Sequence, residues 1–147
     1  MKRILFVCTG NTCRSPMAES ILKTKFKLAG IDDIKVSSAG ISAIDGEKIS
    51  KYSKEALKRL GYKSYGFKSR QINDSIIKRS DMIICMTKAH KDYLQFTGKA
   101  YTLAELVGVC DITDPYGKDL NMYVKTSMEI EDACNKILYK ICKVLED

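Results

Sequence analysis

The sequence has 147 residues, the length of one ordinary domain, and 45% of them are hydrophobic while 29% are charged, a balance typical of a globular fold. No apolar run exceeds five residues, as at Met82–Met86, whereas a membrane-spanning helix needs about 20, so a membrane protein is excluded. The formal net charge of +7 fits first a solvated surface, and the alternative is a field that attracts an anionic substrate. No recognised nucleic-acid-binding motif accompanies it.

The first residues and the cysteines indicate the compartment. Met1-Lys2-Arg3 is charged like the start of a signal peptide, but the apolar run after it is shorter than the roughly 7–15 residues required. A cytoplasmic protein with reduced cysteines is therefore expected. None of the six cysteines forms a C-x-x-C pair, and His90 is the only histidine. We expect no structural zinc, no other metal and no Cys-His protease chemistry.

The first half of the chain predicts strand, helix and strand in turn. Residues 3–8 form a short apolar run typical of a buried strand. Ser15 is expected to cap the next helix, with Pro16 at its first position and Gly30 at its end. Residues 34–38 predict a second short strand.

The second half continues this alternation. Apolar residues at helical spacing over residues 49–60 predict a helix, and residues 81–86 predict a buried strand. Thr87 is expected to cap the helix that follows. Residues 101–103 predict a fourth strand, and residues 120–145 carry the apolar stripe of a long amphipathic helix.

Strands that alternate with helices predict a single α/β domain over residues 1–147, with a four-stranded parallel sheet and helices on both faces. In such sheets, ligands bind beyond the carboxyl ends of the strands, near a topological switch point. The loop after the first strand is therefore the first candidate for a functional site.

That loop covers residues 8–15 and reads Cys-Thr-Gly-Asn-Thr-Cys-Arg-Ser. A bare C-x5-R pattern is weak evidence, but here the cysteine ends a buried strand and a helix follows. Gly10 and Asn11 tolerate positive φ, so successive backbone N–H groups can point inward at the helix N-terminus. A tetrahedral oxyanion fits such a loop.

The loop also carries the groups for nucleophilic chemistry. A thiol at a helix N-terminus beside Arg14 is expected to have a lowered pKa, which makes Cys8 a thiolate at neutral pH. Arg14 offers a planar fork to two phosphoryl oxygens, and the Ser15 hydroxyl can donate to the Cys8 sulfur. The alternative is a buried cysteine at a strand end with an unrelated arginine nearby.

A cysteine that attacks phosphorus needs a proton donor for the leaving group. The candidate is Asp114, in the turn Asp114-Pro115-Tyr116-Gly117. The alternative is that Asp114 only initiates this turn.

Three segments, Cys8–Ser15, Pro16–Glu19 and Asp114–Tyr116, resemble the low-molecular-weight protein tyrosine phosphatase family, and the similarity covers nearly the whole chain. The resemblance implies that Cys8 is the nucleophile, that a phosphocysteine intermediate forms, and that no cofactor is needed. It makes Arg14 the phosphate binder and Asp114 the general acid. The remaining phosphate-binding loop residues are then Thr9, Gly10, Asn11, Thr12, Cys13 and Ser15.

The resemblance also implies a supporting pair and the partners. Asn11 and Ser38 match the two residues that hold the loop in shape. Phosphorylated proteins are the expected partners, with no nucleic acid and no membrane, and a monomer is expected.

Two positions depart from the tyrosine-specific pattern. Thr12 replaces the usual aliphatic residue, and Gly117 follows Tyr116 where a second aromatic residue is typical. Both departures resemble the bacterial protein-arginine phosphatase branch. The chemistry indicates the same substrate, because a hydroxyl can accept from a guanidinium N–H while an aromatic ring gains from apolar contact. We therefore expect Thr12 and Tyr116 to set specificity for phosphoarginine. Phosphotyrosine is the alternative, in which Thr12 is neutral.

Two other functions use a similar loop. Arsenate reductases of similar fold relay a disulfide through two further cysteines, and Cys85 lies near where such a relay begins. The only cysteine that follows closely is Cys110, in the presumed acid loop, and Asp114 has no use in that chemistry. A non-catalytic phosphate-binding module is the other alternative.

Cys13 is a candidate redox partner of Cys8. It lies in the same curled loop, and a disulfide requires that the two Cα atoms lie within about 7 Å of each other. The family resemblance supports a reversible lock that protects the low-pKa cysteine from irreversible oxidation. The alternative is that Cys13 is a small buried residue that packs beneath the loop.

Overall fold

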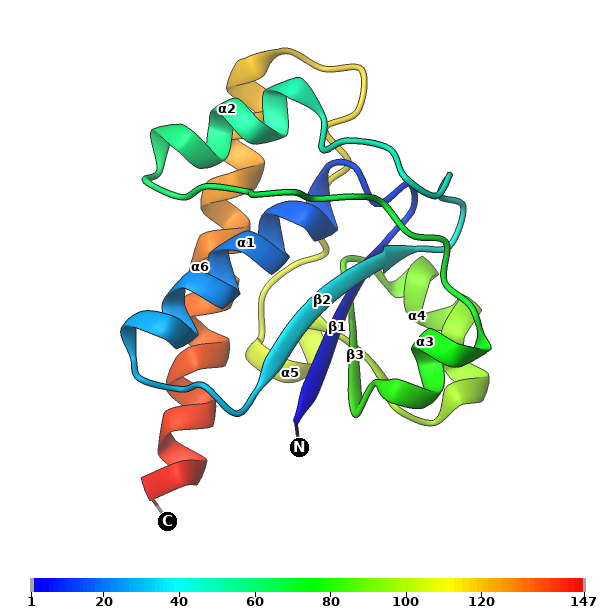
Figure 1. Ribbon diagram of the computed structural model, residues 1–147, viewed down its shortest axis with the longest axis vertical. Coiled ribbons are helices and arrows are strands. Elements are labelled where there is room, and N and C mark those ends of the chain that lie inside the picture. Colours follow the sequence, from blue (N-terminus) through cyan, green and yellow to red (C-terminus); the bar gives the residue numbers. More distant parts are fainter. Residues whose placement is uncertain (1, 147) are drawn as a thin grey trace.

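The computed structural model describes residues 2–146, and a parallel sheet of four strands lies at its centre (Figure 1). The strand order is β2-β1-β3-β4. The strands are β1 (Arg3–Cys8), β2 (Lys35–Gly40), β3 (Met82–Cys85) and β4 (Ala100–Thr102). All three pairings are parallel, which confirms the predicted sheet.

Helices cover both faces of the sheet, as predicted. One face carries α1 (Arg14–Leu28) and α6 (Leu120–Glu146), with α2 (Lys51–Arg59) packed on α1 and α6. The other face carries α3 (Asp74–Arg79) and α4 (Lys88–Leu94), which lie together beside β3 in Figure 1. A 3-10 turn (Gln95–Thr97) and the short α5 (Leu103–Val107) flank β4.

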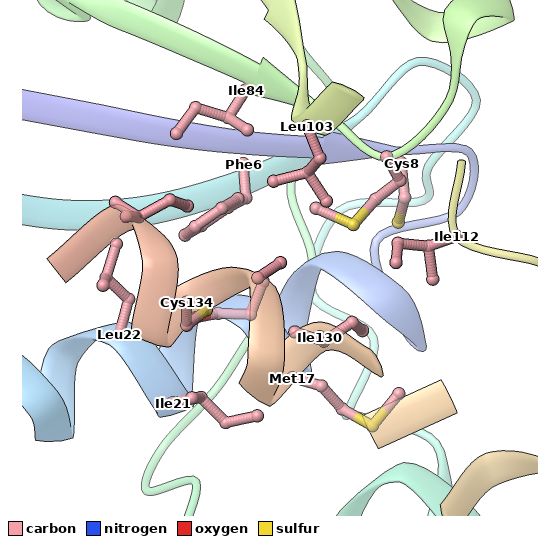
Figure 2. Packing of buried hydrophobic residues seen from close by; sticks show 14 of the residues in the cluster. Phe6, Cys8, Met17, Ile21, Leu22, Ile84, Leu103, Ile112, Ile130 and Cys134 are labelled. Carbon is pink, nitrogen blue, oxygen red and sulfur yellow. The ribbon is translucent and has the colours of Figure 1, made fainter. Parts of the chain in front are cut away.

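Strand β1 is apolar from Ile4 to Cys8, where it is buried on both faces. Ile4 and Phe6 point into the core shared with α1 and α6, whereas Leu5 and Val7 point into the core under α3 and α4. All four side chains are almost completely buried, which stabilises the fold by roughly 1.5–3 kcal/mol for each residue. Figure 2 shows Cys8 at the end of this strand, at the margin of the larger core.

The prediction that Ser15 caps α1 is wrong. The helix begins at Arg14, and the N-cap residue is Cys13, which makes no side-chain capping hydrogen bond. The Ser15 hydroxyl is instead used by its neighbours in the loop. Pro16 therefore lies deeper in the first turn than expected, where a missing N–H still costs no helical hydrogen bond.

Other boundaries differ in smaller ways. Strand β2 extends to Gly40, beyond the predicted residues 34–38, because Gly40 pairs with Cys8. Strand β4 ends one residue earlier than predicted, since Thr102 forms a capping box with Glu105 at the start of α5. The short helices α3 and α5 were not predicted. Thr87 caps α4, as predicted, by accepting from the His90 backbone N–H.

Candidate active site

The loop after β1 lies at a topological switch point. Strand β1 is flanked by β2 on one side and β3 on the other, so the carboxyl end of β1 faces the crevice where α/β sheets bind ligands. Within the loop, Asn11 has a φ of 55°, the single positive value at a non-glycine residue between residues 2 and 146. Of the two loop residues that tolerate positive φ, Asn11 adopts it and Gly10 does not.

A hydrogen-bond network fixes Asn11 in this conformation. The backbone N–H of Arg70 donates to Asn11 Oδ1 at 2.8 Å, so the amide Nδ2 must face the other way. Nδ2 then donates to Ser15 Oγ at 2.8 Å and to Ser38 Oγ at 3.0 Å. The Ser38 hydroxyl in turn donates a hydrogen bond to Glu19 Oε1 at 2.8 Å. The structure thus brings Asn11 and Ser38 together.

This network also determines what Ser15 does. Because Ser15 Oγ accepts from Asn11, its own hydroxyl proton is available for the Cys8 sulfur, 2.8 Å away. The backbone N–H groups of Asn11 and Ser15 are directed at the same sulfur. Cys8 is therefore surrounded by donors that favour a negative charge on it.

Burial acts on Cys8 in the opposite direction. The residue is only 2% exposed, and the loss of hydration raises the pKa of the Cys8 thiol above its usual value. Hydrogen bonds from Ser15 and Asn11 and the charge of Arg14 lower this pKa, but burial is the larger effect. The expectation that the pKa lies below its usual value is therefore wrong for this loop, because the charged sulfur loses more to desolvation than the donors supply.

Arg14 connects the loop to the segment that carries Asp114. The residue is 4% exposed, and its guanidinium Nη1 donates to the Ile112 carbonyl at 2.9 Å. Its Nη2 lies 3.4 Å from Thr9 Oγ1 and 3.5 Å from Asp114 Oδ2. One fixed guanidinium therefore faces both the loop and the carboxylate.

Asp114 initiates the turn, which is one of the two roles considered for it, and its other carboxylate oxygen faces the cavity side of Arg14. Its Oδ1 accepts from the Tyr116 backbone N–H at 3.1 Å, which forms the turn. Its Oδ2 is the atom that faces Arg14, and half of the side chain is exposed. The backbone of this segment is anchored to the end of β3, since Ile112 N–H donates to Met86 O at 3.0 Å.

A cavity of about 280 Å³ opens above Cys8. Every residue of the loop from Cys8 to Arg14 except Asn11 lines it, together with Asp114 and Tyr116. The structure thus brings together Cys8 and Asp114, which are more than a hundred residues apart in the sequence. The loop after β2 adds Ser42, Ile44 and Glu47, which were not predicted.

Three supporting residues were also not predicted. Glu19 belongs to a segment that carried the family resemblance, so its contact with Ser38 had a sequence signal. Arg70 has none, because its contact with Asn11 uses the backbone N–H. His90 lies in α4, and its Nε2 is 2.9 Å from Thr9 Oγ1.

Cys13 lines the cavity and also contacts α6. Its sulfur is 3.5 Å from the Tyr123 hydroxyl on α6, and both Cys8 and Cys13 are free thiols. Among residues 2–146, no three His, Cys, Asp or Glu side chains gather so as to hold a metal ion. No helix within the same range is long and apolar enough to cross a bilayer.

The comparisons with known proteins agree with this geometry. The sequence model of the low molecular weight phosphotyrosine protein phosphatase family matches residues 3–146, so the chain belongs to this family. It is a cysteine phosphatase of this class.

Three individual proteins illustrate the similarity. A protein-arginine-phosphatase from Geobacillus stearothermophilus is 36% identical over 146 residues, which cover 95% of each chain. The crystal structure of a low molecular weight protein tyrosine phosphatase from T. tengcongensis has a TM-score of 0.89 at 37% identity, and covers 95% of this chain and 99% of its own. A YwlE arginine phosphatase variant, in which serine replaces the active-site cysteine and is phosphorylated, has a TM-score of 0.87 at 30% identity over 96% of each chain.

Proposed function

We propose that this phosphatase hydrolyses phosphoarginine on proteins. The observation that carries the proposal is the composition of the cavity above Cys8, where Glu47 and Asp114 supply carboxylates and Thr12 supplies a hydroxyl. Phosphoarginine has a cationic guanidinium directly beside its phosphoryl group, and carboxylates stabilise such a cation. The similarity to a protein named as an arginine phosphatase supports the same substrate.

The proposed first step forms a phosphocysteine. Cys8 Sγ attacks phosphorus, the P–N bond to the guanidinium breaks, and Asp114 donates a proton to the leaving nitrogen. Cys8 reacts as the thiolate, which Ser15, the loop N–H groups and Arg14 stabilise against the opposing effect of burial, and any proton on the sulfur passes to the arriving phosphoryl group. Arg14 and the loop N–H groups hold the phosphoryl oxygens.

The proposed second step releases phosphate. A water molecule attacks phosphorus and gives a proton to Asp114, while the P–S bond breaks and Cys8 Sγ leaves. The Ser15 hydroxyl, 2.8 Å from that sulfur, stabilises the charge that develops on it. The phosphorylated serine in the arginine phosphatase variant supports a covalent intermediate at this position.

Phosphotyrosine is the second candidate substrate. Ile44 and Tyr116 line the cavity and are 69% and 76% exposed, so they can still bury apolar surface against an aromatic ring. One of the similar structures is named a tyrosine phosphatase. An arsenate relay is not favoured, since Cys85 is fully buried in β3 and burial raises its pKa to about 12, which suppresses the thiolate that such a relay needs.

The decisive experiment compares two peptides of identical sequence, one with phosphoarginine and one with phosphotyrosine. We expect the higher kcat/KM with phosphoarginine, and we expect Cys8→Ser to abolish turnover of both. A kcat/KM for phosphotyrosine that equals or exceeds that for phosphoarginine overturns the substrate proposal and leaves the phosphatase activity in place.

A further inference from the structure

Thr9, the residue directly after the nucleophile, is in contact with a buried histidine. His90 Nε2 lies 2.9 Å from Thr9 Oγ1, and His90 is only 4% exposed. The contact joins α4, on one face of the sheet, to the loop after β1. Neither side chain has a role in the steps described above.

The surroundings of the imidazole determine which nitrogen carries its proton. His90 Nδ1 is buried and has no hydrogen-bond partner among the residues that the structure describes. A buried N–H without an acceptor is more costly than a buried lone pair without a donor. The favoured tautomer therefore has its proton on Nε2, which donates to Thr9 Oγ1.

The imidazole also stays neutral. Burial and the charge of Arg14 lower the pKa of His90 to about 4, so a single N–H is presented to Thr9 at neutral pH. Arg14 Nη2, which can only donate, approaches the same oxygen at 3.4 Å. A hydroxyl oxygen has two lone pairs, and both are then directed at these donors.

The Thr9 hydroxyl proton must therefore point elsewhere, and Thr9 lines the cavity above Cys8. We propose that His90 is a positioning residue for the phosphatase reaction, which holds the Thr9 hydroxyl as a hydrogen-bond donor to the phosphoryl group. The Thr9 hydroxyl donates to a phosphoryl oxygen, and the loop stabilises the negative charge on that oxygen during phosphoryl transfer. A preorganised donor at such a position accelerates the reaction because no reorientation is needed when the charge develops.

The competing explanation is structural: His90 packs α4 against the loop and Thr9 does nothing for the substrate. Double-mutant cycles distinguish the two. The variants are Thr9→Val, which keeps shape and removes the hydroxyl, His90→Leu, which removes the donor, and the pair combined. His90→Gln restores an N–H near the Nε2 position. Thr87→Val is the matched control, because it removes the α4 cap that bonds to the His90 backbone without touching Thr9.

The assay measures kcat on para-nitrophenyl phosphate, so the result does not depend on which natural substrate is correct. We expect Thr9→Val and His90→Leu each to lose roughly 10- to 100-fold in kcat, and the double variant to lose no more than Thr9→Val alone. His90→Gln should recover most of the rate, and Thr87→Val should keep it. Orthovanadate, an analogue of the transition state, should bind more weakly to Thr9→Val and His90→Leu by a similar factor.

Three results overturn the proposal. The first is a wild-type kcat for Thr9→Val. The second is a double variant whose loss equals the product of the single losses, which makes the two residues independent. The third is a Thr87→Val variant that loses as much as His90→Leu, which assigns the effect to α4 packing. Circular dichroism and Tm of each variant confirm that the compared proteins are folded.

Discussion

The stability of this protein should depend on pH through one buried residue, His90. The pKa of its imidazole is about 4 in the folded protein, whereas a histidine in an unfolded chain titrates near pH 6.5. As pH falls below about 6.5, His90 becomes protonated in the unfolded chain but stays neutral in the folded protein. Protonation therefore favours unfolding, and this loss of stability continues until the folded-state pKa is passed.

The magnitude follows from the size of the shift. Each unit is equivalent to about 1.4 kcal/mol, so the full difference is roughly 3 kcal/mol, of which about 2 kcal/mol is lost between pH 7.5 and pH 5. Solvent screening reduces this free-energy difference only a little, because His90 is 4% exposed. A loss of this size is a substantial fraction of the 5–15 kcal/mol typical of a domain.

The assay is urea unfolding of the wild type and His90→Gln at pH 7.5, 6 and 5. We expect the free energy of unfolding of the wild type to fall by about 2 kcal/mol more than that of His90→Gln over this range. Both proteins carry the same carboxylates, so the difference isolates the imidazole. His90 is the only histidine, so its ring protons are also unambiguous in an NMR titration. Equal pH dependence in the two proteins, or a ring that titrates near pH 6.5 in the folded state, refutes the reasoning.

Three further outcomes are expected. Asp114→Asn should slow the first chemical step by about 10²–10⁴-fold for a poor leaving group and much less for para-nitrophenol, whereas a uniform loss across leaving groups would make Asp114 structural. Glu47→Gln should lower kcat/KM on a phosphoarginine peptide by about 2- to 5-fold relative to phosphotyrosine, while Glu129→Gln, the same charge change on the exposed side of α6, should leave the ratio unchanged. Cys13→Ser should be active when reduced but recover poorly after peroxide, because Cys8 over-oxidises without a partner; full recovery would show that Cys13 only packs.

The sequence predicted the central part of this site because its constraints are local. Cys8, Asn11 and Arg14 lie within one loop, between a strand and a helix that are each recognisable from their own residues. The same locality produced an error: a serine before a proline fits a helix cap, so Ser15 was assigned two roles. Its contact with the Cys8 sulfur was predicted, whereas the hydrogen bond that it accepts from Asn11 was not.

What the sequence did not predict depends on contacts made across the fold. His90 reaches Thr9 from 81 residues away, and Arg70 reaches Asn11 from 59 residues away. Glu47 is an exposed acidic residue with no motif around it, so its place at the cavity follows only from the path of the loop after β2. The direction of the Cys8 pKa was missed for a related reason, since the donors are visible in the loop sequence but the degree of burial is not.

The way in which Arg14 is held has a consequence for the order of events. Its Nη1 is bound to the Ile112 carbonyl, which belongs to the fixed backbone, whereas its Nη2 faces Asp114, a side chain at the cavity mouth. A phosphoryl group that enters the cavity competes with Asp114 for Nη2, while the bond to Ile112 can persist. Substrate entry therefore frees the carboxylate from its ionic partner without moving the guanidinium far. In the proposed mechanism, Asp114 is thus released from Arg14 as the substrate arrives, and it can then take up the proton that it donates to the leaving nitrogen.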